Sequence, residues 1–347
     1  YAVLMDGRKV GQLESSRSET PEGIRHREAL RMALERNGDV VELAITESTL
    51  EPVDGQPVGF SSRLDTAGSR ISSEARVDGG QVEWRSEGSG AQETRRFAWP
   101  EGALLPHGQR LLARYAYRSL EPGSGQPIEV EVDTLGPERI ELPGGPIETI
   151  AVRQKTRGVG GEQTGELWLD PATLDVLRLR LPLLGMSLDA VYCDRACADA
   201  ANQPGDVFAS TLVAAPLPLS TRERGRTLRY RLLLDGAITV DLPGVAGQTP
   251  GSGAGADWVR VDPRGGVDRR PIASDLAANR WLQSEHPELV ALAESLAGDG
   301  SAQTRMRRLE AGVGRHLAVK SLRIGYASAL DAARLGELGE TRTPGLA

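Results

Sequence analysis

Alternation of hydrophobic residues with their neighbours dominates the first two hundred residues. Val41, Leu43 and Ile45 follow this spacing, and Ile128 to Val132 repeats it. Successive side chains of a strand point to opposite faces, so such spacing buries one face of a sheet. Turn dipeptides separate these segments, without helices of crossover length between them, which favours antiparallel pairing. We therefore expect a β-sheet domain over residues 1–200, folded as a curved sheet or half-barrel.

The tract "LWLDPATLDVLRLRL" shows this pattern on both sides of a turn. Asp170-Pro171 is a turn signal between two alternating segments. The second segment places leucines on one face and arginines on the other: Leu177, Leu179 and Leu181 against Arg178 and Arg180. One face of this part of the sheet should be buried and the other solvated.

The string D-G-x-x-V-G occurs at Asp6–Gly11 and again at Asp54–Gly59. Asp-Gly tolerates the positive φ angles of tight hairpin turns, so recurring hairpins are the main interpretation. An internal duplication is the alternative. Asp78-Gly79 and Asp235-Gly236 are further turn signals.

Residues 201–265 read as a linker and a small β segment. The tract "LRYRLLLDGAITVDL" resumes the alternation, and "GVAGQTPGSGAGADWVRVDP" predicts a flexible loop that leads into a strand around Trp258 and Val261. A phosphate-binding loop would open into a helix, and no helical pattern follows this tract.

After Asp262 the period becomes helical, and residues 266–347 form the third predicted domain. One apolar stripe begins after the start signals Ser284 and Pro287 and stops at Gly298. A short helix should begin at the cap Ser328 and end at Gly336. The two apolar stripes are Leu289, Leu292, Ala293 and Leu296, and then Met306, Leu309, Val313 and Leu317. The expected fold class is α+β, with β-rich regions first and helices last.

Composition fits a soluble globular protein of two or three domains. Hydrophobic residues make up 39% of the 347 residues, charged residues make up 26%, and the net charge is −7. No run of 18 apolar residues occurs, so no membrane span is expected. The acidic balance gives no electrostatic reason to expect nucleic acid as a partner.

The arginine run in "TRERGRTLRYRL" is the exception to this balance. A nucleic-acid patch is one interpretation, and a solvated strand face interleaved with acid elsewhere is the favoured one. The run comprises Arg222, Arg224, Arg226, Arg229 and Arg231.

Cys193 and Cys197 are the only cysteines. Their spacing is too wide for a thioredoxin-type pair, and no second ligand pair for zinc lies nearby. A local disulfide in an oxidising compartment is the first interpretation; free thiols and a metal or catalytic role are the alternatives.

The four histidines are scattered, and no G-x-S-x-G elbow or H-E-x-x-H helix occurs. They are His26, His107, His286 and His316. Residue patterns therefore identify no catalytic, metal or cofactor-binding residue, and no cofactor is expected.

The segment from Asn279 to Glu340 resembles the opening of the transglutaminase-like core of bacterial proteins in the papain-like cysteine superfamily. Its landmarks are Asn279-Arg280-Trp281-Leu282, the helix after His286-Pro287, Arg307-Arg308-Leu309-Glu310 and Tyr326-Ala327-Ser328-Ala329. Upstream, "MDGRKVGQLESS", "LPLLGMSLDAVYCDRACADAANQP" and "DVFASTLV" resemble the β-rich extension that precedes this core in secreted or membrane-attached members.

In that family a Gly-Asp-Cys-Thr-Glu-His motif would follow, with the thiolate at the start of a helix and a later histidine and aspartate completing the triad. Here Gly339, Glu340 and Thr341 are followed by Arg342, Thr343 and Pro344, so the nucleophile is missing. Thr341 has no later histidine to act as its base. The resemblance thus implies a truncated or inactive member, and no catalytic residue is carried over.

Two functions follow as expectations. The first is a protein of the cysteine acyl-transfer and amide-hydrolysis lineage that is catalytically incomplete. The alternative is a non-enzymatic periplasmic binding or scaffold protein whose sheet holds an apolar or peptide ligand, with a lipid-carrier-like half-barrel as a further variant. A protein or peptide is the candidate partner. The resemblance and the cysteine pair imply a periplasmic or secreted location, and the start at Tyr1 is consistent with removal of an upstream signal.

Overall fold

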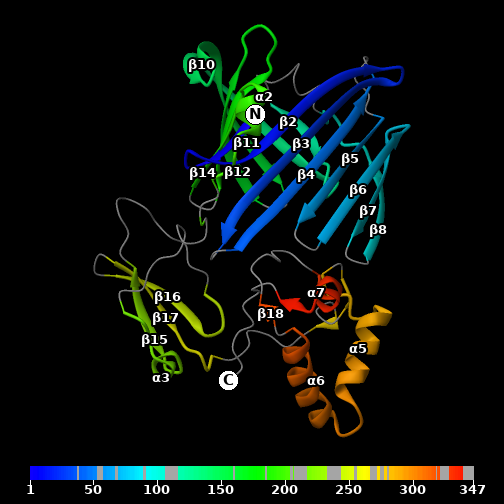
Figure 1. Ribbon diagram of the computed structural model, residues 1–347, viewed down its shortest axis with the longest axis vertical. Coiled ribbons are helices and arrows are strands. Elements are labelled where there is room, and N and C mark those ends of the chain that lie inside the picture. The colour runs from blue at the N-terminus through cyan, green and yellow to red at the C-terminus, as the bar shows by residue number, and fades with distance from the viewer. Residues whose placement is uncertain are drawn as a thin grey trace. The chain divides into compact units, whose positions relative to one another are not determined.

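The computed structural model describes most of the chain (Figure 1). The described residues are 1–36, 39–52, 58–66, 69–88, 91–105, 116–158, 161–183, 186–203, 206, 217–232, 244–253, 256–265, 272–273, 277–279, 281–317, 319–320 and 328–338. They fall into two compact units, one of Tyr1–Thr211 with Ala278–Ala347 and one of Leu212–Ala277.

Fourteen strands of the first unit form one sheet in the order β8-β7-β6-β5-β4-β3-β2-β1-β14-β13-β12-β11-β10-β9. Every neighbouring pair is antiparallel. The strands are β1 (Ala2–Met5), β2 (Arg8–Thr20), β3 (Gly23–Arg36), β4 (Asp39–Glu51), β5 (Gly59–Thr66), β6 (Ser69–Asp78), β7 (Gln81–Gly88), β8 (Ala91–Ala98), β9 (Tyr117–Glu121), β10 (Gln126–Leu142), β11 (Gly145–Gly158), β12 (Gly161–Leu169), β13 (Val176–Leu183) and β14 (Met186–Val191).

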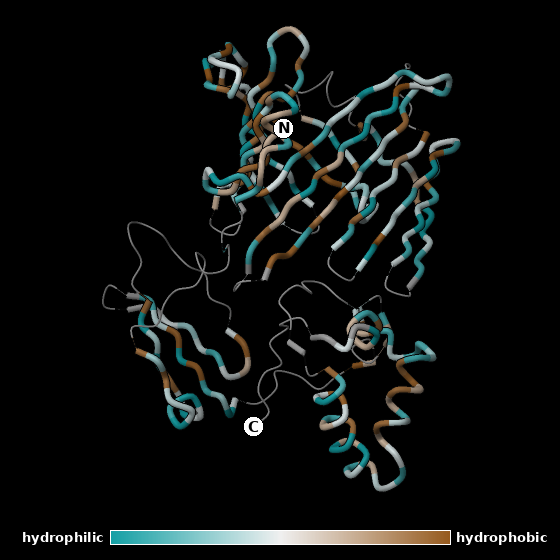
Figure 2. Tube along the Cα trace, viewed as in Figure 1, coloured by the Kyte–Doolittle hydropathy of each residue, from teal (hydrophilic) through white to brown (hydrophobic). Residues whose placement is uncertain are grey.

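Short β1 joins the two halves of this sheet. It pairs with β2 on one side and with β14 on the other, so the meander β2–β8 and the meander β9–β14 become one surface. Figure 2 shows hydrophobic and hydrophilic residues alternating along these strands, as the sequence pattern predicts.

Tight turns connect the strands where the sequence signals them. Asp6 and Gly7 have φ angles of 46° and 79° and form a two-residue hairpin loop between β1 and β2. Gly79 and Gly80 connect β6 to β7, one residue later than Asp78-Gly79 suggests. The predicted turn after Asp170 separates β12 from β13. Residues 53–57 and 233–243, which hold the Asp54 and Asp235 signals, lie outside the described residues.

Two apolar clusters fill different parts of the inner face of the sheet, which is the face that lines the pocket described below. Val3, Met5, Val10, Met32 and Met186 form the first cluster. The second joins β5–β7 to β9: Phe60, Ala75, Val82, Trp84, Leu105 and Leu120. Ser73 Oγ donates to the Pro122 carbonyl at 2.7 Å, which also ties the β9–β10 turn to β6. Strands from both ends of the sheet order therefore meet, so the sheet is strongly curved.

The second unit contains a three-stranded antiparallel sheet in the order β15-β17-β16. Its strands are β15 (Leu228–Leu232), β16 (Gln248–Gly253) and β17 (Ala256–Val261), and α3 (Thr221–Arg224) precedes them. The strand around Trp258 is confirmed, but the preceding tract was wrongly expected to be a loop. It contributes β16, an edge strand, where Pro250 is tolerated because its missing N–H faces away from the ladder.

The C-terminal helices begin and end close to the predicted signals. They are α5 (Pro287–Ala297), α6 (Ala302–His316) and α7 (Ala329–Leu335), and the two-residue strands β18 (Val319–Lys320) and β19 (Glu337–Leu338) pair in parallel. Ser328 and Asp331 form the capping box of α7, and Gly336 ends it with a φ of 65°. His286, rather than Ser284, caps α5 by accepting from the Glu288 N–H.

The expected α+β class with a substantial helical core is wrong. Of the described residues, 58% lie in strands and 16% in helices, so the protein is mainly β. The helices predicted from the helical period are present, but α5, α6 and α7 have only 11, 15 and 7 residues and make up a small share of the fold. Several strands of the large sheet are as long, β10 having 17 residues.

Candidate functional site

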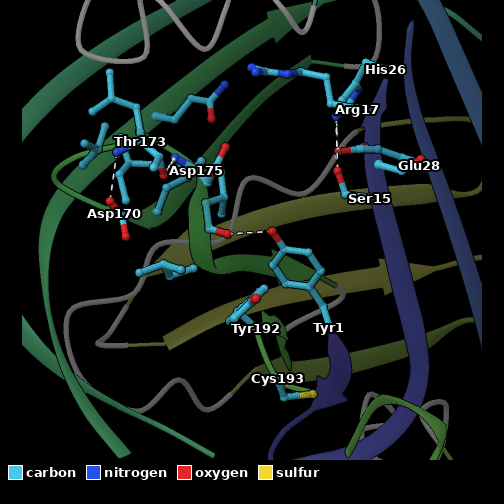
Figure 3. Close-up of a pocket in the computed structure, with 18 of the residues that line it drawn as sticks. Tyr1, Ser15, Arg17, His26, Glu28, Asp170, Thr173, Asp175, Tyr192 and Cys193 are labelled. Atoms are coloured by element: carbon cyan, nitrogen blue, oxygen red, sulfur yellow. Dashed lines mark hydrogen bonds and ion pairs between the residues drawn. The ribbon is translucent and has the colours of Figure 1, made fainter. Parts of the chain in front are cut away.

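A pocket of about 1540 Å³ lies within the large sheet. Residues of β2–β4 line one wall and residues of β9–β13 line the other, together with the β12–β13 turn and the segment from Tyr192 to Cys197. Figure 3 shows Ser15, His26 and Glu28 on one side and Asp170, Thr173 and Asp175 across from them. The curvature of the sheet thus brings together strands that are far apart in its order.

The wall from β2–β4 is polar because strand register aligns polar residues across it. Ser15 lies opposite Glu28, and Glu28 lies opposite Glu47. His26 Nε2 is 3.1 Å from Ser15 Oγ and 3.8 Å from Glu28 Oε1. Arg17 lies opposite His26 in the next register position. No single strand shows this group in its sequence, because each strand contributes only one or two members.

Glu47 is the residue of this wall whose pKa is raised. Burial raises its pKa, and the charges of Glu28 and Glu121 raise it further, whereas a hydrogen bond with Ser62 lowers it. Two carboxylates placed directly opposite each other repel. Protonation of Glu47, or a hydrogen-bond donor in the pocket, would relieve this repulsion.

Aliphatic side chains of β10–β13 form much of the other wall, beside Gln154 and the polar residues of the β12–β13 turn. Alternation along each strand directs one set of aliphatic side chains into the pocket, as the sequence pattern predicts for Leu177 and for Ile128. On the other face of the same strands, Arg178 and Arg180 contact Asp189. The main aliphatic residues of the wall are Ile128, Val132, Val152, Leu167, Leu169 and Leu177.

Two tyrosines stand at the side of the pocket (Figure 3). Tyr1 Oη donates to the Val176 carbonyl at 2.7 Å. The rings of Tyr1 and Tyr192 pack edge to face, with their centres 5.6 Å apart. Burial, then the charges of Glu28 and Asp175, raises the pKa of Tyr1 to about 12. Its hydroxyl therefore stays protonated near neutral pH and acts as a hydrogen-bond donor. Tyr192 is 52% exposed.

Cys193 and Cys197 also line the pocket, and both are free thiols in this structure, contrary to the expected disulfide. Cys193 precedes α2 (Arg195–Asp199) and Cys197 lies within it, and Asp194 caps this helix by accepting from the Cys197 N–H at 2.8 Å. Burial, then the neighbouring Cys193, raises the pKa of Cys197 to about 11. A protonated thiol is a weak nucleophile, so this geometry does not activate Cys197 for acyl transfer.

The remaining candidate residues lie apart from one another. His316 Nε2 is 2.8 Å from the Ala333 carbonyl, at the end of α6, and His286 caps α5. His107 and residues 339–347, which include Thr341, lie outside the described residues. In the described part of the chain, no cluster of three or more His, Cys, Asp or Glu side chains could hold a metal ion. Nor does that part contain a helix long and apolar enough to cross a membrane.

Comparison with known proteins found no matching family model, no similar curated protein and no similar solved structure. Function is therefore inferred from the pocket itself.

Proposed function

We propose that this chain is a binding protein whose curved sheet holds a ligand with an apolar body and a polar end. The observation that carries the proposal is the two-sided lining of one large pocket. Ligand pockets are typically concave and mostly apolar, with a few placed polar groups that fix orientation. The aliphatic wall from β10–β13 suits the body of such a ligand.

The polar wall specifies the other end of the ligand. Glu28 and Glu47 offer carboxylate oxygens, which only accept hydrogen bonds when ionised, while Ser15 and His26 can donate or accept. The matching end of a ligand is therefore rich in hydrogen-bond donors. This chemistry fits an amphiphile or a peptide with an apolar stretch, the ligand class of the binding-protein alternative.

A neutral naphthylamine dye, whose fluorescence rises in apolar surroundings, tests the proposal. We expect saturable binding to the folded chain. Val132 lines the pocket from β10, and Leu135 on the same strand is 50% exposed and outside the lining. Val132→Trp should weaken binding about tenfold or more by narrowing the pocket at its aliphatic wall, a change of about 1.4 kcal/mol.

Leu135→Trp is the matched control and should leave the dye affinity unchanged. The proposal fails if the folded wild-type chain does not bind the dye, or if both tryptophan variants weaken binding equally. Circular dichroism of each variant shows whether the sheet has formed.

The transglutaminase-like lineage stays a prediction of the resemblance. The positions of its expected nucleophile lie outside the described residues, and the raised pKa of Cys197 makes that thiol a poor substitute. Mass spectrometry after incubation with an acyl donor tests it: an adduct on Cys193 or Cys197 would support catalysis by this chain.

A further inference from the structure

The small sheet of the second unit concentrates arginines on one face. Arg229 of β15 lies directly opposite Arg260 of β17, and Arg231 lies opposite Trp258. Thr249 and Gly251 of β16 complete the same face. Directly opposite residues have Cβ atoms about 5 Å apart, and alternate residues along a strand lie about 7 Å apart. Three guanidinium groups therefore share a small area, which we call the arginine face.

The arginine face contains no acidic residue at any of these strand positions, because Asp257 belongs to the opposite face. Arg229, Arg231 and Arg260 are all exposed, and none of them forms an ion pair with a carboxylate in the structure described. On β5 and β6 of the large sheet, in contrast, Arg63 and Arg70 share Asp65. Arg229 and Arg231 are exposed, as expected for a solvated strand face, whereas Arg222 and Arg224 lie on α3 rather than on a strand.

Trp258 gives the arginine face a fixed geometry. The Arg229 guanidinium lies 4.1 Å from the centre of the Trp258 ring. The ring also lies so close to Gly251 that a Cβ atom built there would be 2.2 Å from Trp258 Cζ2. Stacking on the Trp258 ring holds the Arg229 guanidinium in place. Because Arg229 and Gly251 both lie against this ring, an unpaired base cannot stack on it.

Like charges placed directly opposite each other in a sheet are destabilising, so the Arg229–Arg260 pair lowers stability unless an anion lies against it. The surrounding unit is locally basic as well. Residues 212–277 contain nine arginines and seven Asp or Glu residues, whereas the whole chain has a net charge of −7. A multiply anionic partner matches this charge.

We propose that the arginine face binds the surface of an anionic phospholipid bilayer. Arginine suits phosphate because its planar guanidinium donates two parallel hydrogen bonds. The same unit also exposes aliphatic side chains, with Leu217 at 74%, Val245 at 48% and Ile272 at 55% exposure. Binding sites at a bilayer surface commonly combine basic and apolar side chains. The covered ring of Trp258 disfavours single-stranded nucleic acid as the partner. This site is independent of the pocket in the large sheet.

Vesicle co-sedimentation of the full chain tests the proposal. We expect binding to vesicles of equal phosphatidylglycerol and phosphatidylcholine at low salt, and loss of binding at ~0.5 M NaCl because surface charges are screened. Vesicles of phosphatidylcholine alone should not bind. Each arginine near an anionic surface contributes about 1 kcal/mol, so R229Q/R231Q/R260Q should weaken binding about 100-fold.

The matched control is R25Q/R27Q/R31Q, which removes the same charge from exposed positions on β3. It should change vesicle binding less than threefold. Equal loss in both triple variants, or no binding of the wild type to anionic vesicles, would overturn the proposal. So would tighter binding to a DNA oligonucleotide than to the vesicles. The single variant R231Q, with a smaller expected loss of about fivefold, covers the case in which the triple variant does not fold.

Discussion

Asp189 on β14 shows how a single residue can hold the outer face of the large sheet together. It is 6% exposed and accepts hydrogen bonds from Arg178 at 2.7 and 2.9 Å, from Arg180 at 3.0 Å and from Ser187 at 2.8 Å. Burial alone would raise the pKa of Asp189. Hydrogen bonds from Arg178 and Ser187, and the two arginine charges, outweigh burial and hold the pKa below its usual range.

Asp189→Asn should destabilise the protein by about 2 kcal/mol at pH 7. Removing one partner of a fully buried ion pair destabilises a protein by more than this. Arg178 and Arg180 are partly solvated, so the stability lost on removing the Asp189 charge is smaller. Because the folded pKa is lowered, this stability is present above the unfolded pKa near 3.8 and is lost as the pH falls through the folded pKa. Urea titrations at pH 7 and pH 3 measure the difference. Asp133→Asn, at an exposed position on β10, is the control and should have little effect.

Glu47 should show the opposite dependence. Its folded pKa is raised, so the stability that it contributes is present below the unfolded pKa, near 4.5, and is lost as the pH rises through the folded pKa. Glu47→Gln should therefore raise the melting temperature at pH 7 by a few degrees and change it little at pH 4. An equal shift at both pH values would show that repulsion within the polar wall is not the cause.

At the scale of elements, the turn between β9 and β10 links the two ends of the sheet order. Ser73 donates to the Pro122 carbonyl, Arg95 donates to the Ser124 carbonyl, and Gly125 lies against the ring of Trp84. Gly125 has a φ of 63°, and a Cβ atom there would be 2.8 Å from Trp84 Cδ1. Both the backbone angle and the contact require glycine.

Gly125→Ala should destabilise the protein by about 2 kcal/mol, because the added methyl group strains the turn and displaces Trp84. At Gly144, in the β10–β11 turn, an added methyl group would have no atom within 4 Å, and the φ angle is not positive. Gly144→Ala should change the free energy of unfolding by less than about 0.5 kcal/mol. Thermal melts of the two variants, read together with the dye assay, show whether the turn also shapes the pocket.

At the scale of the whole molecule, the large sheet and the C-terminal helices differ in how many of their residues are buried. Each central strand of the large sheet has hydrogen-bonded neighbours on both sides. In contrast, Gly312 is the only buried residue of α6 and Ala297 the only one of α5, and Met306 is 65% exposed. The free energy needed to open the structure locally should therefore be lower for α5 and α6 than for the central strands of the large sheet.

Amide hydrogen exchange should be faster over residues 287–316 than over β2–β4 and β10–β12, because few buried contacts oppose opening of the helices. Mass spectrometry of peptic fragments measures both regions in one sample. Uniformly strong protection through residues 285–335 would contradict this expectation and would indicate that the exposed apolar stripe of α6 is covered in solution.

Local signals in the sequence determined the strands, many turns and the helix ends. The alternation at Ile128–Val132, the Asp6-Gly7 hairpin and the capping box at Ser328 depend on residues within a few positions of one another, and the structure has each of them. The helical period overstates the proportion of helix, because period alone does not show how far an element extends. The loop expected before Trp258 became an edge strand through pairing with β17.

Only the tertiary structure decided the pocket and the arginine face. Glu28 and Glu47 become neighbours through the register of β3 and β4, and they line one pocket with Leu167 only because the sheet curves. Arg229 meets Arg260 across 31 positions of sequence, through a strand order in which β17 lies between β15 and β16. Side-chain period is local and can be read along one strand, whereas register and curvature depend on partners that are distant in the chain.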